Sequence, residues 1–319
     1  MGETTTIDHA TIRELSVPSG LRTTLDLVLV WGVIAGAMAA AHWFDRWYVY
    51  ALAVVIVGSR QNALATLAHE AWHGLLFRSR RLNHLVGRWL YSYPIGILYY
   101  HDRTRHLRHH RTVGHDHDPD WINYTSETRE TPARVAIYLG SLLLGRMLVA
   151  SVVSFATLGQ PRIGVQREPT SETHPSVAVE FGCAVICQAA IAIAMSAGFG
   201  RWWSYPLLWL LPLATFAGFF ANFRAFVEHV TADDSVTPDA RLRDIAAGSV
   251  TRFFISPSHF NFHALHHAHP SIPHYNLPRG RREYIEQLGA YPFEVWPGYL
   301  RGFTSHLRAL QARAASFHG

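Results

Sequence analysis

Lysine is absent from this chain of 319 residues, and charge of either sign is scarce. The 28 basic residues are all arginine, acidic residues number 23, and charged residues make up 16% of the sequence. An average soluble domain carries about 25% charged residues, so this composition disfavours an ordinary soluble protein. The net charge of +5 is too small to indicate binding to DNA or RNA, and we expect no nucleic acid partner.

Cysteine is nearly absent as well. The two cysteines, Cys183 and Cys187, are too few for a disulfide framework, a zinc ribbon or a cysteine-held iron–sulfur cluster. Both fall in an apolar stretch, where we expect them to act as small packing residues. The first 26 residues are polar, and no short apolar run ends in a cleavage site, so no signal peptide is expected.

Long hydrophobic runs are abundant. Residues 27–44, 181–200 and 202–223 carry no formal charge, and 47–68 is apolar apart from Arg60, which we expect to snorkel to the headgroups. A helix needs about 20 mostly apolar residues to cross a membrane. The sequence therefore predicts four membrane-spanning helices at about 25–44, 47–68, 180–200 and 202–223.

A fifth apolar segment, 135–157, has Arg146 at its centre. A charge at the middle of a span costs roughly 2.5–3.5 kcal/mol on insertion scales. Histidines before and after this segment can share one site only if they lie on the same side of the membrane. The chain must then cross the membrane an even number of times between them, and the predicted spans at 180–200 and 202–223 already supply two crossings. We therefore predict a helix lying at the membrane interface over about 135–157.

Arginine placement predicts the orientation. Residues 78–111 hold eight arginines and one acidic residue, Asp102, whereas the links after the first and third spans hold only Arg46 and Arg201. The arginine-rich side of a membrane protein is usually cytoplasmic. We expect a single all-α membrane domain over 1–319, with both termini and a helical cap, formed by segments 69–134 and 224–319, in the cytoplasm.

Histidine is the unusual residue, with 21 unevenly spread copies, nine of which fall in four places that stand out. On a helix, residues three and four apart share a face, so each cluster presents the imidazoles needed to bind a metal ion. Nine imidazoles are too many for one four-coordinate zinc and suit two metal ions with room for oxygen or water. Zinc, copper, iron and nickel all accept imidazole ligands. The nine candidates are His69 and His73 (HEAWH), His106, His109 and His110 (HLRHH), His229 (FVEH), and His263, His266 and His267 (HALHH).

Two other functions compete with a two-metal centre. HExxH is also the zinc-protease motif, in which Glu70 would act as general base between His69 and His73. That interpretation leaves both HxxHH triplets unexplained. A metal carrier or transporter would place polar ligands along a path inside the spans, whereas nearly all of these histidines fall outside them.

HxxxH, HxxHH and a final HxxHH, threaded through four spans in this order, resemble the three histidine boxes of the membrane fatty acid desaturase superfamily. The third box and its prolines (NFHALHHAHPSIP, from Asn261) carry the resemblance, which covers roughly 60–278. The first-box neighbourhood (HEAWHGLLFRSRRLNHLVGRWL) and the separate Glu228-His229 are more similar to bacterial relatives of dihydrorhizobitoxine desaturase.

The resemblance implies two iron ions held by all nine histidines, although zinc can replace iron during overexpression. It implies oxygen-dependent desaturation of an acyl chain or related aliphatic substrate, in a bacterial inner membrane. Hydroxylation or ketolation by the same centre stays an alternative. The chain has no haem domain of its own, so electrons would come from a ferredoxin-like or other external carrier, which could dock on the arginine-rich face.

Several neighbouring residues are candidates for supporting roles. Metal-bound histidines usually donate their second N–H to a carboxylate or carbonyl. The nearby carboxylates are Glu70, Asp102, Asp116, Asp118, Asp120 and Glu228. By their spacing, His101, His115, His117, His259 and His269 are expected to lie off the shared faces. Some desaturases place an asparagine one turn before the isolated histidine; here that position is Ala225, and Asn222 lies two turns back.

Overall fold

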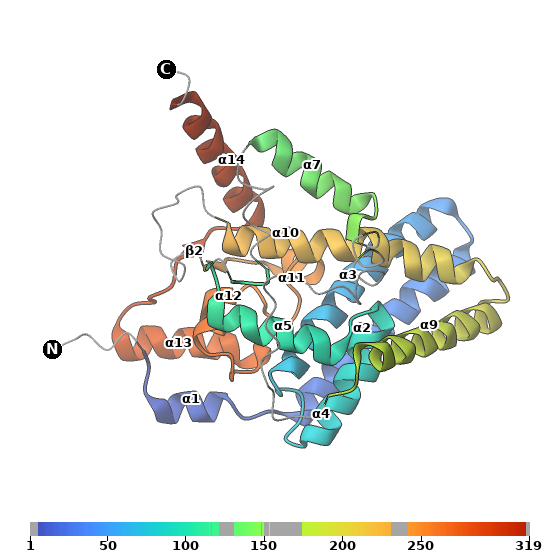
Figure 1. Ribbon diagram of the computed structural model, residues 1–319, viewed down its shortest axis with the longest axis horizontal. Coiled ribbons are helices and arrows are strands. Elements are labelled where there is room, and N and C mark those ends of the chain that lie inside the picture. Colours follow the sequence, from blue (N-terminus) through green and yellow to red (C-terminus); the bar gives the residue numbers. More distant parts are fainter. Residues whose placement is uncertain are drawn as a thin grey trace.

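The chain was described from a computed structural model, which places residues 6–115, 117–120, 131–147, 149, 153, 174–230 and 242–316. Four long apolar helices run side by side on one side of the molecule (Figure 1). They are α2 (Gly20–Phe44), α3 (Trp47–Trp72), α9 (Val177–Phe199) and a fourth, Pro206–His229, which consists of η3 (Pro206–Leu210), η4 (Leu213–Ala217) and α10 (Gly218–His229). The predicted all-α architecture with four membrane-spanning helices is confirmed.

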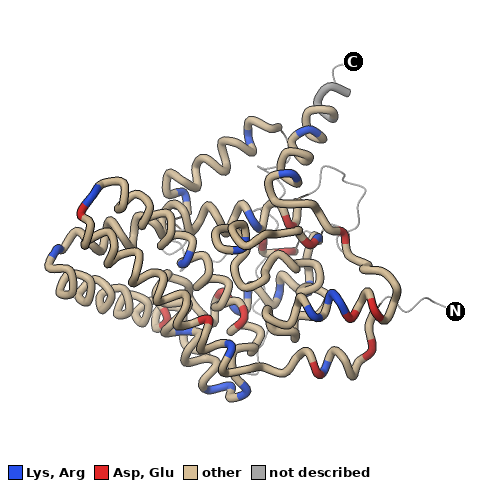
Figure 2. Tube along the Cα trace, turned by 180° about the vertical axis from the view of Figure 1, so that it is seen from behind, with Lys and Arg blue, Asp and Glu red and all other residues tan. Residues whose placement is uncertain are grey.

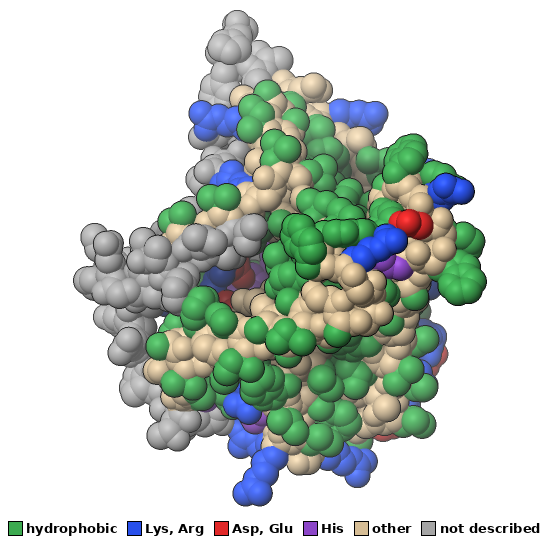
Figure 3. Space-filling view, turned by 90° about the vertical axis from the view of Figure 1, so that its right-hand side faces the viewer, with side chains coloured by type: hydrophobic (Ala, Val, Ile, Leu, Met, Phe, Trp, Pro, Cys, Tyr) green, Lys and Arg blue, Asp and Glu red, His purple; other side chains and the backbone are tan. Residues whose placement is uncertain are grey.

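The spans form two hairpins whose turns are tied together. Asp45, in the left-handed conformation with φ 47°, ends α2, and Gly200 ends α9 in the same conformation. Arg201 donates to Asp45 at 2.9 Å, which joins the two turns. Figure 2 shows few charges along the four helices between their ends. Hydrophobic side chains cover most of this end of the molecule (Figure 3), with Trp43 and Trp202 well exposed, as expected of rings at a membrane interface.

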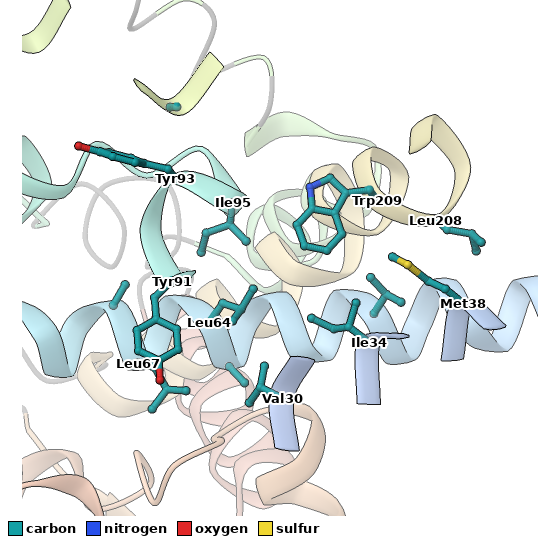
Figure 4. Close-up of a cluster of buried hydrophobic side chains, with 14 of the residues drawn as sticks. Val30, Ile34, Met38, Leu64, Leu67, Tyr91, Tyr93, Ile95, Leu208 and Trp209 are labelled. Atoms are coloured by element: carbon teal, nitrogen blue, oxygen red, sulfur yellow. The ribbon is translucent and has the colours of Figure 1, made fainter. Parts of the chain in front are cut away.

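The core of the span bundle includes a segment that does not cross the membrane. The π-helix η1 (Gly87–Ser92) and the short η2 (Tyr93–Ile95) insert between α2, α3 and the fourth span (Figure 4). Irregular backbone at this depth must have its polar groups satisfied within the protein. Gln188 of α9 does this by donating to the carbonyls of Tyr93 at 3.0 Å and Pro94 at 2.7 Å.

The remaining elements form a cap at the opposite end of the bundle from the hairpin turns (Figure 1). A short parallel pair of strands, in which Asp244 faces Val295, holds two distant parts of the cap together. The cap contains α1 (His9–Leu15), α4 (Arg80–Val86), α5 (Tyr99–Thr112), β1 (Asp244–Ile245), α11 (Ser249–Phe254), α12 (His263–Ala268), η6 (His274–Asn276), α13 (Leu277–Leu288), β2 (Val295–Trp296) and α14 (Tyr299–Ser316).

The segment predicted to lie at the interface begins with α7 (Pro132–Leu143). Its twelve residues are too few to cross a membrane. Val135 and Leu142 are buried in a cluster that includes Phe226 of α10 and Tyr299 of α14, while Ile137 on the other side is 70% exposed. Much of 144–157 lies outside the described residues, so its placement at the interface stays a prediction.

Arg60 does not snorkel, which corrects the expectation from the sequence. Its side chain is buried, and its guanidinium lies 3.8 Å from the ring centre of Phe253 and donates to the Phe253 carbonyl. Ser59 donates to the same carbonyl at 2.8 Å. Both donors satisfy one carbonyl at the C-terminal end of α11, where the carbonyls of a helix have no partners within it. Arg60 therefore holds the cap against α3.

Candidate metal centre

All nine candidate histidines gather where the spans meet the cap. His69 lies in the last turn of α3 and His73 directly follows that helix, while His229 is the final residue of α10. The other six come from two cap helices, three from α5 and three from α12. Four segments that are far apart in sequence thus bring their imidazoles to one place.

Five of these imidazoles form a first group. One ring nitrogen from each lies within 4.8 Å of the corresponding nitrogen of every other member. The Nε2 atoms of His73 and His106 are 2.9 Å apart, and those of His110 and His266 are 3.2 Å apart. The first group consists of His69, His73, His106, His110 and His266.

The remaining four imidazoles form a second group. Ring nitrogens of His109, His229 and His267 also lie within 4.8 Å of one another. His263 joins them, because its Nε2 is 2.7 Å from that of His229 and its ring centre is 4.5 Å from that of His267. The rings of His110 and His267 stack at 4.1 Å, so the two groups are direct neighbours.

Each HxxHH motif is divided between the two groups. In α5, His106 and His110 share a helix face and join the first group, whereas His109 joins the second. In α12 the arrangement is reversed, since His263 and His267 join the second group and His266 the first. In each triplet, the two histidines that are four residues apart belong to one group, and the third histidine belongs to the other. This partition is suited to two adjacent metal ions.

The chemistry of the donors fits metal ions. Both ring nitrogens of His69 and of His267 are buried without a hydrogen-bond partner, an arrangement that is costly unless another ligand satisfies them. Burial lowers the pKa of His73 to about 3 and that of His110 to about 2, and lowers the pKa of His106, His263, His266 and His267 well below the usual value. These six imidazoles are therefore neutral at pH 7, the form that binds metals.

Two of the candidate carboxylates lie beside the second nitrogen of a group member. Asp118 Oδ1 is 2.8 Å from Nδ1 of His109, and Glu228 Oε2 is 3.4 Å from Nδ1 of His263. Glu228 is held in turn by the Tyr299 hydroxyl at 2.5 Å and by Arg224 at 2.7 Å. Tyr299 could not be identified from the sequence, because it is far from every histidine cluster along the chain.

The other candidate carboxylates have additional partners, although Asp120 Oδ2 also lies 3.9 Å from Nδ1 of His109. Glu70 lies 3.9 Å from Nδ1 of His69 and accepts a hydrogen bond from the backbone N–H of His274 at 2.9 Å. Asp102 accepts from the N–H of Leu98 at the start of its own helix, and Asp120 pairs with Arg105. Asp116 lies outside the described residues.

The histidines and the asparagine that were left out of the site have other contacts. His269 Nε2 is 2.6 Å from the Tyr284 hydroxyl, and His259 faces Arg252 at 3.4 Å. His115 and His117 are exposed. Asn222 accepts from the Tyr138 hydroxyl at 3.1 Å and donates to the Gly218 carbonyl within its helix.

Phe260 covers the first group and was missed by the sequence analysis. Its ring centre is 4.5 Å from that of His69 and 5.5 Å from that of His266, and the residue is almost fully buried. The Arg224 guanidinium lies on this ring at 4.4 Å. Phe260 therefore excludes water from one side of the histidines.

Distant side chains fix the ends of two of the helices that carry histidines. Asn83 and the Tyr99 hydroxyl both donate to the Ala71 carbonyl at 2.8 Å, at the C-terminal end of α3. Glu180 of α9 accepts from the N–H groups of Tyr100 at 3.0 Å and His101 at 3.1 Å, in the first turn of α5. These bonds satisfy helix-end groups that would otherwise be buried without partners.

Comparison with known proteins agrees with this arrangement. A family described as fatty acid desaturase matches residues 45–299. The chain is 25% identical to an sn-1 acyl-lipid omega-3 desaturase (ferredoxin) of Synechocystis sp., over 90% of this chain and 82% of the relative. It is 24% identical to dihydrorhizobitoxine desaturase of Bradyrhizobium elkanii, over 76% and 70%. It is 23% identical to a beta-carotene ketolase of Paracoccus sp., over 82% and 95%.

Proposed function

Because this chain belongs to the fatty acid desaturase family, we propose that it is an oxygen-dependent di-iron desaturase of an acyl chain or related aliphatic substrate. The observation that carries the proposal is the division of nine buried or half-buried imidazoles into two adjacent groups. All-imidazole groups of five and four leave coordination positions for oxygen or water. Structural zinc sites, in contrast, are usually closed by four ligands.

The residues of the chain hold and shield the two metal ions. The five histidines of the first group would bind one ion, and the four of the second group the other. Asp118 orients His109 through its Nδ1 atom, and Glu228 lies beside the Nδ1 atom of His263. Phe260 keeps water from the first group. Two iron ions bound here would supply the redox chemistry with which oxygen, two electrons and two protons remove two hydrogens from the substrate and yield two water molecules.

Desaturation is favoured over hydroxylation or ketolation because two of the relatives above are named desaturases. The ketolase relative supports the alternative, since it matches a similar share of this chain. Zinc proteolysis is disfavoured, because Glu70 accepts a hydrogen bond from the His274 backbone and three further histidines surround the HExxH pair. A transporter is disfavoured because the histidines gather at one end of the spans.

A cationic pocket beside the first group is the proposed place where an electron donor docks. The pocket has a volume of about 380 Å³, includes His73 in its wall, and has no acidic residue among the described residues that line it. Positive surfaces attract acidic carriers, and one relative is named as a ferredoxin-dependent enzyme. Its lining residues are Pro18, Trp72, His73, Gly74, Phe77, Arg78, Arg80, Asn83, His84 and Arg103.

The location of the protein follows from the same features. We propose that the cap faces the cytoplasm of a bacterium, because arginines concentrate near the cap and a soluble donor must reach it. The spans would then lie in the inner membrane, among the lipids that surround or supply the substrate. The proposed reaction has no nucleic acid substrate, so no nucleic acid partner is proposed.

The proposal is tested on protein purified in mild detergent and reconstituted with iron. We expect about two iron ions per chain, and an alkene product that forms with reduced ferredoxin and oxygen but not without oxygen. An alcohol or ketone product would support the alternative. One tightly held zinc ion per chain, together with peptidase activity that Glu70→Gln abolishes, would overturn the proposal.

A further inference from the structure

Arg243 and Asp244 are adjacent residues that contact two of the helices that carry histidines. Both side chains are almost fully buried, at 2% and 1% exposure, and Asp244 begins β1. Burying charged groups is costly unless they are paired or hydrogen-bonded, so their partners show what they do. Neither residue lies close in sequence to a histidine cluster.

Asp244 caps the N-terminus of α12. Its Oδ1 atom accepts hydrogen bonds from the N–H groups of Ala264 at 2.8 Å and Leu265 at 3.3 Å, while its Oδ2 accepts from the Tyr291 hydroxyl. The residue at the N-cap position, Phe262, makes no side-chain capping bond. A carboxylate from another part of the chain thus satisfies the free donors of this helix, where negative charge is favoured.

Arg243 caps the C-terminus of α10 in the complementary way. Its guanidinium donates to the carbonyl of Val227 at 3.0 Å and to that of Val230. The same group lies 4.0 Å from the ring centre of Trp296 and 3.3 Å from a Glu294 carboxylate oxygen. Positive charge is favoured at the C-terminal end of a helix, where carbonyls lack partners.

The two capped helix ends are the ends that carry the second group. His229 is the last residue of α10 and His263 is the first of α12, and their Nε2 atoms are 2.7 Å apart. His267 follows one turn later. Three of the four imidazoles of the second group therefore depend on how these two ends are placed. The first group takes His69 from α3, His73 from directly after α3, and His106 and His110 from α5, and only His266 from α12.

We propose that Arg243 and Asp244 act as paired positioning residues, which set the spacing of His229 against His263 and His267. Because Arg243 directly precedes β1 and Asp244 begins it, a single segment fixes both helix ends relative to each other. The pairing of β1 with β2 in turn anchors this segment. The inference rests on the proposed two-metal centre, and it predicts that loss of either residue weakens one metal position selectively.

The test uses the full chain in detergent, loaded with cobalt(II) as a spectroscopic probe, with metal measured per chain. We expect about two cobalt ions in the unchanged protein and about one in Asp244→Ala and in Arg243→Met, because α10 and α12 supply three of the four members of the second group but only His266 of the first. His229→Ala and His73→Ala provide reference spectra for loss at the second and first groups. The spectra of Asp244→Ala and Arg243→Met should match that of His229→Ala.

Two further variants separate positioning from general stability. Asp244→Asn keeps an oxygen that can accept from Ala264 and Leu265, so it should retain about two cobalt ions and restore the normal spectrum. Asp8→Ala removes the exposed cap of α1, where Asp8 accepts from Ala10 and Thr11, and should also leave both ions in place.

The outcomes are distinct. Fewer than two ions in the unchanged protein would overturn the two-metal centre, and with it this inference. Two ions with an unchanged spectrum in Asp244→Ala, or loss of both ions from folded Asp244→Ala, would overturn the inference alone. Loss of one ion together with rescue by Asp244→Asn would support it.

Discussion

His109 and His110 are neighbours in sequence whose rings belong to different groups. His109 lies with His229 and His267, and its Nδ1 faces Asp118 at 2.8 Å. The Nε2 atom of His110 is 3.2 Å from that of His266. Successive residues of a helix point about 100° apart, so one turn of α5 can serve two metal ions that lie on either side of it.

The first prediction compares alanine substitutions at these two positions. His109→Ala should lose the metal of the second group and His110→Ala that of the first, and each should lower turnover at least about 100-fold, since even outer partners of a metal site are worth 10- to 100-fold. Metal per chain, cobalt spectra and product formation check this. His115→Ala, which changes an exposed histidine just beyond α5, should behave like the unchanged protein.

Identical cobalt spectra for His109→Ala and His110→Ala would contradict the division into two groups. Retained turnover in either variant would contradict the assignment of that histidine as a ligand.

Eight of the nine histidines could be predicted from sequence because i, i+3 and i, i+4 spacing is a local property of a helix, whereas the isolated His229 has no such partner. Their division into two groups could not. Whether His266 pairs with His110 or with His263 depends on how α5 and α12 cross, which is set by contacts between distant segments. Glu228 and Asp118 were found because they are close in sequence to a box, and Tyr299 was missed because it is not.

At the scale of elements, α5 depends on a carboxylate from a membrane-spanning helix. Glu180 lies in the first turn of α9 and accepts from the N–H groups of Tyr100 and His101, 80 and 79 residues away in sequence. It is almost fully buried. Because α5 gives histidines to both groups, this contact should affect both metal positions.

The second prediction follows from that contact. Glu180→Ala should lower metal occupancy at both positions and destabilise the protein by about 1–3 kcal/mol, the cost of leaving buried N–H groups without an acceptor. Glu180→Gln, which keeps one oxygen acceptor, should lose less. Ser176→Ala removes the cap of α9 itself, where Ser176 accepts from Val179, and serves as the control.

Thermal unfolding in detergent and metal content measure these effects. Loss of a single metal ion from Glu180→Ala, or an unchanged Tm, would show that the capping bonds do not hold α5 in place.

The four spans could be predicted because each is a long, nearly uncharged run. The segment between α4 and α5 could be recognised only as too short to cross. Its insertion into the bundle depends on the Gln188 side chain, which supplies donors for the carbonyls of Tyr93 and Pro94. Arg60 was misjudged for a similar reason, since its partner, the Phe253 carbonyl, belongs to a segment almost 200 residues later.

At the scale of the whole molecule, the apolar spans and the charged cap meet at the histidines. Figures 1 and 2 together place most charged residues near the cap and few along the spans. His73 both belongs to the first group and lines the cationic pocket, so the pocket reaches a proposed metal ligand from the surface of the cap. An electron donor bound there would lie close to the centre without entering the membrane.

The last prediction concerns this pocket. Arg78 is exposed and lines it, so Arg78→Glu should raise the KM for reduced ferredoxin several-fold through charge repulsion while metal content and kcat at saturating donor stay unchanged. Steady-state turnover at increasing ferredoxin concentration measures this, and the difference from the unchanged protein should shrink as salt screens the charges. Arg13→Glu reverses an exposed charge on α1 outside the pocket and should leave the KM near its original value. Equal effects of the two substitutions would mean that the donor responds to the total charge of the cap, and the pocket beside His73 would no longer be its docking site.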